Sequence, residues 1–389
     1  MKRRDFLLCA AVLPWSLRSL ASSPPETLDG LLATTVRDGI APGAALVASR
    51  RGVVKFQQTH GTYCSLEARQ TPLTPETLHP LYSFSKLITG TVVGMTIQAG
   101  RLGYDDPVVK HVPEFKGDGR ERITIRHCLT HAAGLAKVEW KLAGDEAGWQ
   151  AALQTLCQAP IEWDPGARTS YHGWSGAFLA AECVRRVSGG RPWADLCREK
   201  LFAPLGAKSL TFTLPENNQA LALVPQPNAA KPLPKSAKAA FGFAGHPGAG
   251  CVGTLADALK VLQLHLQRGM WHSRKLIAKD VFRQIHTVQY AREIEAARAA
   301  GKSPDHEPWG LGVLLRGNGP ACGGHKWFGF SDQKSPTVFG HAGIDTLIGV
   351  GDLRSQTALV FATTDSPKPA EQTIPLRNKV TNLVFQELK

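Results

Sequence analysis

The chain has 389 residues, of which 43% are hydrophobic and 20% charged, a composition typical of a globular protein with one large domain and a second lobe. Its formal net charge is +13, but the basic residues are scattered and do not follow one element together with aromatic residues. We therefore expect no nucleic-acid partner, and no apolar run after the N-terminus is long enough to span a bilayer.

The first 21 residues have the features of an export signal. Arg3 and Arg4 precede a short apolar run, which resembles a twin-arginine signal, and Ser19-Leu20-Ala21 offers the small residues that a signal peptidase reads. We predict export, with a periplasmic location, and a mature domain at 22–389. The alternative is an uncleaved membrane anchor, for which the apolar run is short.

Seven cysteines follow the signal, and no two of them have the two-residue spacing of a zinc knuckle or a thioredoxin-like motif. Their odd number argues against a complete disulfide framework. We expect most of them to be small buried apolar residues.

Periodicity predicts a helix within 25–39, a hairpin of Gly43–Ser49 and Val53–Thr59, and an apolar helix that follows Ser83 and runs to about Ala99. A further helix is expected over Ile123–Leu135, capped by Thr124 and ended by Gly134.

His127 and His131 lie four apart on that helix, a spacing that could suit a metal. No acidic or cysteine ligand accompanies them in the sequence. We interpret both as structural and expect no metal and no cofactor.

In the second half of the chain, the sequence pattern predicts the following helices, strands, turns and loops. These are a turn at Trp163–Gly166, helices at Ala177–Ser188, Thr254–Gln267 and Ala291–Ala300, a solvated loop at Pro225–Ala240, a Gly-rich insertion at Gly317–Pro336, strands at Thr346–Gly351 and Gln356–Thr363, and a helix over 371–389. Strands near both ends with helices between them predict one sheet built from both ends and a helical lobe inserted in the middle. The insertion is either a lid over a cleft or a surface loop.

Ser83 and Lys86 form a Ser-x-x-Lys pair, and residues three apart share a helical face. If Ser83 opens the helix, the helix N-terminus and partial burial should lower the pKa of Lys86 and make its amine a better base. The Ser83 N–H could also face a developing oxyanion. The alternative is an N-capping serine followed by a surface lysine.

Two other segments could complete such a site. Tyr171 follows a Pro-Gly turn, and a nearby ammonium would stabilise its phenolate for proton relay. Gly340–Ile344 precedes the first C-terminal strand, where N–H groups could complete an oxyanion hole; an ordinary tight turn is the alternative. Ser175 in Gly173-Trp174-Ser175-Gly176-Ala177 is a rival nucleophile, but the turn-rich residues before it lack the buried strand of a nucleophile elbow.

The order of these motifs resembles the serine beta-lactamase-related family, which includes class C beta-lactamases, D-amino-acid-processing peptidases and esterases. The motifs are Ser83-x-x-Lys86, Leu129-Thr130-His131-x-x-Gly134-Leu135, Pro165-Gly166 with Tyr171, Gly250…Gly253-Thr254…Asp257, and Gly340-His341-Ala342-Gly343. The resemblance covers the chain from about residue 27 onward. It implies an α+β fold: an antiparallel sheet flanked by helices, plus an all-helical lobe, with the site between them. It also implies Ser83 as the acylated nucleophile, Lys86 and Tyr171 as the proton-transfer pair, and the N–H groups of Ser83 and Ile344 as the oxyanion hole.

Two positions depart from the family pattern. The second motif is commonly Tyr-x-Asn but reads Tyr171-His172-Gly173 here, and the third is often Lys-Thr-Gly but reads His341-Ala342-Gly343. The groups that hold a substrate amide and carboxylate are therefore missing, and His172, His341 and Gly343 remain as candidate substrate-binding residues. A Tyr-His second motif is similar to esterase-like members.

We therefore predict an exported serine hydrolase that acts through an acyl-enzyme on a small-molecule ester or peptide. The alternatives are a beta-lactamase or D-peptidase with the same chemistry, and a non-catalytic binding protein that keeps the fold. The sequence does not indicate an oligomeric state.

Overall fold

The computed structural model describes residues 27–64, 70–138, 145–213, 245–318, 329–330, 332–333, 335–344, 346–364 and 370–389. The predicted export signal, the loop at 225–240 and most of the 317–336 insertion lie outside these residues. Within the described part of the chain, no helix combines the length and the apolar character that crossing a membrane requires.

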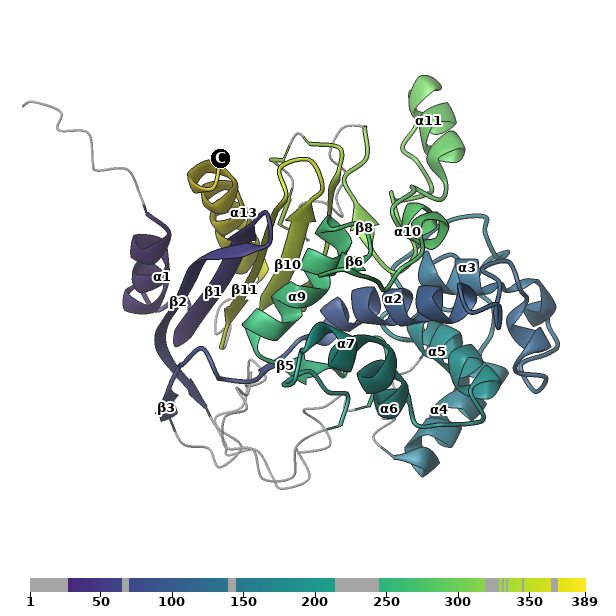
Figure 1. Cartoon of the computed structure of the whole chain (residues 1–389). Coiled ribbons are helices and arrows are strands. Elements are labelled where there is room, and N and C mark those ends of the chain that lie inside the picture. Colours follow the sequence, from purple (N-terminus) through teal and green to yellow (C-terminus); the bar gives the residue numbers. More distant parts are fainter. Residues whose placement is uncertain are drawn as a thin grey trace, which may run out of the picture.

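One seven-stranded antiparallel sheet forms the centre of the fold, in the order β3-β2-β1-β11-β10-β9-β8 (Figure 1). Its strands are β1 (Gly43–Arg50), β2 (Val53–Cys64), β3 (Gln70–Pro72), β8 (Leu314–Leu315), β9 (Val338–Gly343), β10 (Leu347–Asp352) and β11 (Thr357–Thr363). The N-terminal strand β1 pairs with the C-terminal strand β11, from Ala44 opposite Thr363 to Arg50 opposite Thr357. The prediction of one antiparallel sheet built from both ends of the chain is confirmed.

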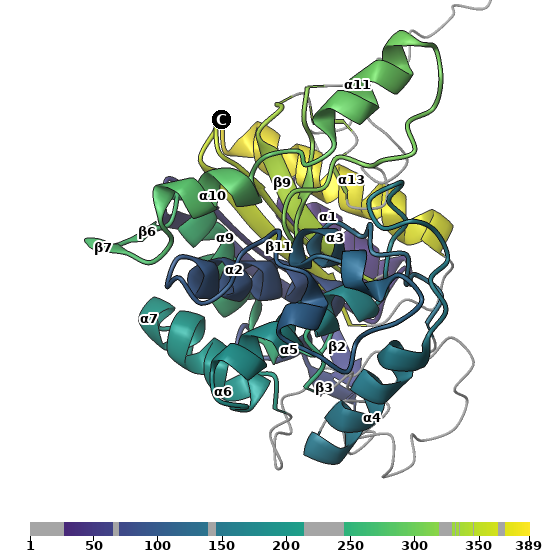
Figure 2. The same ribbon diagram turned by 90° about the vertical axis from the view of Figure 1, so that its right-hand side faces the viewer.

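Helices cover both faces of this sheet because its central strands are apolar on both sides. On β1, Ala44, Leu46 and Ala48 pack in the cluster with α1 (Leu28–Arg37) and α13 (Ala370–Glu387), whereas Ala45 and Val47 face the larger core. Helix α9 (Leu255–Leu266) covers that second face, in contact with β1, β10 and β11 (Figures 1 and 2). The alternation follows the two-residue period of a strand.

The remaining helices form a lobe beside the sheet, and α2 (Ser85–Ile97) runs through its core (Figure 1). The other helices are α3 (Ile125–Leu129), α4 (Glu146–Gln158), α5 (Ser175–Val187), α6 (Trp193–Cys197), α7 (Ala203–Leu205), α10 (Lys279–Ile285) and α11 (Ala291–Ala299). Shorter pieces are the 3₁₀ turns η1 (Tyr82–Phe84), η2 (Val108–Lys110) and η3 (Arg120–Arg122), the π turn η4 (Arg198–Phe202), and the strand pairs β4 (His79–Pro80) with β5 (Val252–Gly253) and β6 (Met270–Trp271) with β7 (Arg274–Lys275).

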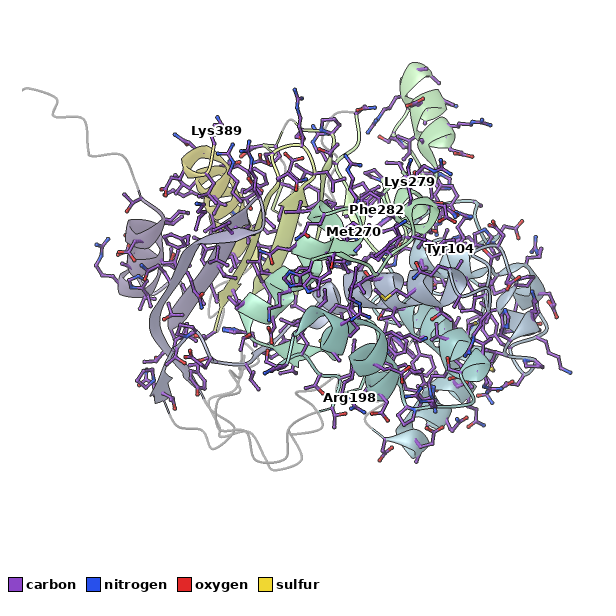
Figure 3. All side chains as sticks on the ribbon, in the orientation of Figure 1. Tyr104, Arg198, Met270, Lys279, Phe282 and Lys389 are labelled. Carbon is purple, nitrogen blue, oxygen red and sulfur yellow. The ribbon has the colours of Figure 1, made fainter. Side chains whose placement is uncertain are left out.

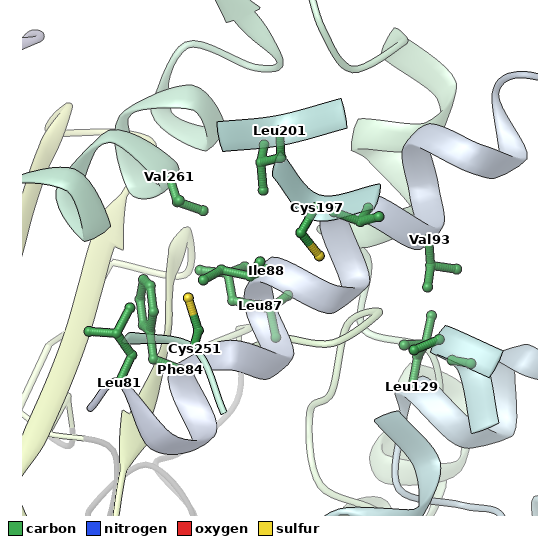
Figure 4. Close-up of a cluster of buried hydrophobic side chains, with 14 of the residues drawn as sticks. Leu81, Phe84, Leu87, Ile88, Val93, Leu129, Cys197, Leu201, Cys251 and Val261 are labelled. Carbon is green, nitrogen blue, oxygen red and sulfur yellow. The ribbon is translucent and has the colours of Figure 1, made fainter. Parts of the chain in front are cut away.

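The lobe and one face of the sheet share a single apolar core. Leu87 and Ile88 of α2 meet Cys197, Leu201 and Cys251 there (Figure 4). Four described cysteines are buried free thiols, as predicted: Cys128, Cys183, Cys197 and Cys251. The labelled basic side chains Arg198, Lys279 and Lys389 lie far apart at the periphery, in keeping with scattered positive charge (Figure 3).

One local prediction and one alternative interpretation were wrong. The helix capped by Thr124 ends at Leu129, not at Gly134, because the chain leaves helical geometry and His131 takes a left-handed φ of 60°. Ser83 lies in the 3₁₀ turn η1, which leads directly into α2, so the prediction of an apolar helix that follows Ser83 is confirmed. His341, Ala342 and Gly343 belong to strand β9 itself and pair with β10, so the alternative of an ordinary tight turn at this segment was wrong.

The η1 turn packs directly on the sheet because Gly349 of β10 has no side chain. A Cβ at Gly349 would overlap the ring of Phe84, which is fully buried and follows Ser83 in the chain. Further along β10, a Cβ at Gly351 would lie 2.7 Å from the ring of Phe339, a residue of β9. Gly349 thus sets the spacing between the sheet and η1, whereas Gly351 makes room for a ring of the neighbouring strand β9.

Gly349→Ala and Gly351→Ala should each destabilise the protein by about 1–3 kcal/mol, since each forces an extra methyl against a buried ring. Only the ring displaced by Gly349→Ala adjoins Ser83. Denaturant unfolding should show comparable losses, while labelling of Ser83 by a fluorophosphonate should slow in Gly349→Ala alone. Equal labelling rates in the two variants would contradict a link between this contact and the Ser83 position.

Candidate active site

Ser83 and Lys86 meet where the sheet, η1 and the helical lobe join. The Lys86 Nζ lies 3.2 Å from the Ser83 Oγ. Tyr82, directly before Ser83, has a φ of 45°, a conformation that an aromatic residue rarely adopts. Strained backbone of this kind is frequent at functional sites.

Lys86 is 2% exposed, and its amine has two further partners. It donates to the carbonyl oxygens of Gly173, at 2.7 Å, and of Gly248, at 2.9 Å. Burial lowers the pKa of Lys86 from its usual 10.5 to about 7. The lowered pKa expected from the sequence is therefore present, and burial is its physical cause.

Tyr171 adjoins this pair. Its hydroxyl hydrogen-bonds with Ser83, and the Lys86 Nζ lies 5.0 Å from the centre of its ring. Burial around the hydroxyl raises the pKa of Tyr171 and outweighs the Ser83 hydrogen bond, although 39% of the residue as a whole is exposed. The expectation of a stabilised phenolate was wrong, because desolvation of the phenol dominates.

Aromatic rings surround Tyr171. The ring of His131 lies 4.7 Å from it, and those of Trp309 and His341 lie 6.1 Å from it, measured between ring centres. His131 and Trp309 also contact each other, with ring centres 4.3 Å apart. These neighbours restrict the movement of the Tyr171 ring.

His172 is a scaffold residue in this structure and not an exposed substrate contact. Its side chain is fully buried, its Nε2 accepts from the Leu135 N–H at 3.0 Å, and its Nδ1 bonds the Ser170 carbonyl at 2.6 Å. Its backbone N–H donates to the His131 Nδ1 at 3.0 Å. Protein groups thus occupy both ring nitrogens, which corrects the interpretation of this side chain as substrate-binding.

His341 lies on β9 beside Tyr171 and is also fully buried. Its Nδ1 bonds the Ala342 carbonyl at 2.7 Å. Burial, with a smaller contribution from the charge of Lys86, lowers the pKa of His341 to about 3. The ring is therefore neutral at physiological pH and supplies no positive charge to a substrate carboxylate.

Gly343 ends β9 beside η1, the turn that holds Ser83, and Ile344 follows it. A Cβ on Gly343 would lie 2.6 Å from the Leu81 carbonyl oxygen, so only glycine permits this approach of β9 to η1. Ile344 follows with a φ of 40°, and 52% of its surface is exposed. The segments that hold the Ser83 and Ile344 N–H groups are thus brought side by side.

The rival nucleophile is placed elsewhere. Ser175 is the first residue of α5, is 1% exposed, and donates its hydroxyl to the Leu135 carbonyl at 2.6 Å. Its side chain joins α5 to the segment after α3.

The two histidines considered as metal ligands also have structural contacts. His127 takes part in the capping box of α3 with Thr124, and His131 packs on Tyr171. Among the residues that the structure describes, no group of three or more His, Cys, Asp or Glu side chains could hold a metal.

Sequence reasoning missed Gly173 and Gly248 as partners of Lys86. Gly173 drew attention only because it lacks an amide side chain, whereas its carbonyl is what contacts the amine. Backbone carbonyls leave no signal in residue identity, so no motif could have revealed them. His131 was part of a recognised motif, but only the structure shows it against Tyr171.

The sequence matches the family described as Beta-lactamase over residues 28–381. Esterase EstB of Burkholderia gladioli is 28% identical over 298 residues, which cover 66% of this chain and 74% of that protein. A beta-lactamase of Yersinia enterocolitica is 28% identical over 148 residues, which cover 38% of this chain and only 37% of that protein.

A solved structure of a family VIII carboxylesterase has the same fold, with a TM-score of 0.71 at 20% identity over 92% of this chain and 96% of that chain. The predicted mixed helical and antiparallel fold is confirmed. From the family match and these relatives, the chain is a serine hydrolase that belongs to the beta-lactamase family.

Proposed function

We propose that this protein is a carboxylesterase in which Ser83 forms an acyl-enzyme and Lys86 is the base. The observation that carries the proposal is the set of three partners around the Lys86 amine. A neutral amine has two N–H donors and one lone pair. Two partners, the carbonyls of Gly173 and Gly248, can only accept, so the lone pair is left for the Ser83 hydroxyl.

The reaction follows from this arrangement. The Ser83 hydroxyl gives its proton to Lys86 as the oxygen attacks the ester carbonyl carbon. The oxyanion accepts hydrogen bonds from the N–H groups of Ser83 and Ile344. Collapse breaks the bond to the alkoxide, which takes a proton from Lys86 through the Tyr171 phenol. Water then attacks the acyl carbon and gives a proton to Lys86. Collapse breaks the bond to the Ser83 oxygen, which takes that proton from Lys86, and the acid is released.

An ester substrate fits the polar groups of the site better than a beta-lactam or a D-peptide. His341 is neutral where the resemblance places a carboxylate-binding lysine, and Gly173 has no amide side chain. Tyr171 and Ile344 are both partly exposed beside the nucleophile and offer apolar surface to the ester. The similarity to Esterase EstB and to the family VIII carboxylesterase supports the same choice.

Export belongs to the proposal as well and rests on the sequence of residues 1–21. Removal of that segment would leave the mature domain, 22–389, in the periplasm.

A fluorophosphonate should label wild-type protein and Ser175→Ala but not Ser83→Ala, since Ser83 lies beside the Lys86 amine whereas Ser175 bonds a backbone carbonyl. Mass spectrometry of the labelled peptide identifies the residue. Label retained in Ser83→Ala, or lost in a folded Ser175→Ala, would contradict the assignment of the nucleophile.

Purified protein should hydrolyse p-nitrophenyl butyrate with a kcat/KM at least about 100-fold above that for a chromogenic cephalosporin, as missing anchor groups weaken transition-state binding of the latter. Parallel initial-rate measurements decide. Faster cephalosporin turnover would favour the beta-lactamase alternative, and Ser83-dependent binding without turnover of either would favour a binding protein.

The value of kcat/KM should rise with pH through a midpoint near 7, because Lys86 must lose its proton to act as base. Below the midpoint the amine is charged and activity should fall about tenfold per pH unit. The raised pKa of Tyr171 should leave the profile flat to about pH 9. A midpoint near 10 would contradict the assignment of Lys86.

A stability measurement checks the same pKa without a substrate. The unfolded chain holds the Lys86 proton up to about pH 10.4, whereas the folded protein releases it near 7. The unfolded state therefore binds more protons between these values, and wild-type stability should rise with pH there, relative to Lys86→Met, by at most about 1.4 kcal/mol per pH unit.

A further inference from the structure

Ile344 holds a backbone conformation that its side chain disfavours. Its φ of 40° lies in the left-handed region, where β-branched residues are outliers. More than half of its surface is exposed, so burial of the side chain does not compensate for the strain. Such a conformation persists only where neighbouring groups impose it.

The peptide before Ile344 is fixed by its contact with η1, the turn that holds Ser83. Gly343 lies against the Leu81 carbonyl, and a Cβ there would also lie 3.2 Å from the Cβ of Tyr82. The Gly343 carbonyl accepts the Thr346 N–H at 3.2 Å, which closes the turn between β9 and β10.

The peptide after Ile344 is fixed from the opposite side of the sheet, by Arg377 of α13. The Arg377 Nη2 donates to the Ile344 carbonyl at 2.6 Å, and Arg377 is only 3% exposed. Its Cβ is packed so closely that a Cβ on Gly329 would lie 3.3 Å away. A hydrogen bond from a cation is about twice as strong as a neutral one. Because the buried guanidinium has lost its water, it must keep its hydrogen bond to the Ile344 carbonyl, and this fixes the position of that carbonyl.

We propose that Arg377 is a positioning residue for catalysis, which orients the Ile344 N–H toward the oxyanion by holding the carbonyl of the same residue. With the peptides on both sides of Ile344 held, its φ and ψ are determined, and so is the direction of its N–H. Arg377 itself does not touch the substrate. This inference rests on the proposed function, because it assumes that the Ile344 N–H serves the oxyanion.

The inference predicts a loss that appears in the transition state and not in substrate binding. A displaced oxyanion donor lowers kcat, whereas KM depends on ground-state contacts. With p-nitrophenyl butyrate, Arg377→Met should lower kcat about 10- to 100-fold, somewhat less than complete loss of one oxyanion donor, and change KM less than about threefold. Arg377→Lys, which can still donate to the carbonyl, should recover part of kcat. The pH midpoint near 7 should not move, because Lys86 keeps its surroundings.

Two controls on the same helix separate positioning from general stability. Lys379→Met removes a positive charge from an exposed position, and Val380→Ala opens a cavity where α13 packs on the sheet. Both should keep kcat near wild type, although Val380→Ala should lower the melting temperature. The inference is overturned if Arg377→Met keeps wild-type kcat, if KM carries the loss, or if Val380→Ala lowers kcat equally. Absence of Ser83 labelling in wild-type protein would instead refute the proposed function.

Discussion

The enclosure of one amine decides the chemistry of this molecule. Lys86 is almost fully buried at the point where α2 enters the helical lobe, and that burial brings its pKa to about 7. In water the same side chain would be charged, and it could not take a proton from serine. The carbonyls of Gly173 and Gly248 replace the lost water, so that the amine remains hydrogen-bonded in its neutral form. In the proposed mechanism this amine is the base that takes the proton of Ser83.

That enclosure depends on close packing around η1, the turn that holds Ser83. Gly349 admits the Phe84 ring against the sheet, and Gly343 admits the Leu81 carbonyl against β9. Both contacts join β-strands from the C-terminal part of the chain to a turn more than 250 residues earlier. The geometry of Ser83 is therefore a property of the sheet as well as of its own helix.

The buried histidines are neutral parts of the scaffold. Low pKa values follow from their burial, to about 4 for His172 and about 3 for His341, and both rings bond backbone carbonyls. His131 packs on Tyr171 while its Nδ1 accepts the His172 N–H. A cluster of histidines beside a nucleophile would ordinarily be considered for acid–base chemistry. Here His131 and His341 pack against the Tyr171 ring, and His172 in turn bonds His131; Lys86 is the group beside Ser83 whose pKa lies near 7.

Sequence alone determined the order of the motifs, the main helices and strands, and the three side chains that meet. Ser83 and Lys86 are neighbours in one turn, so local spacing was enough to pair them, and the family resemblance supplied Tyr171. Only the tertiary structure decided the ionisation of these groups: it lowered the pKa of Lys86 by burial and raised that of Tyr171, against the expected phenolate. It also showed that His172 is a structural residue and not a substrate-binding one, and it revealed the contacts of Gly173, Gly248 and Arg377. The physical reason is that desolvation and backbone hydrogen bonds depend on which distant segments pack together, and Lys86 meets carbonyls 87 and 162 residues away.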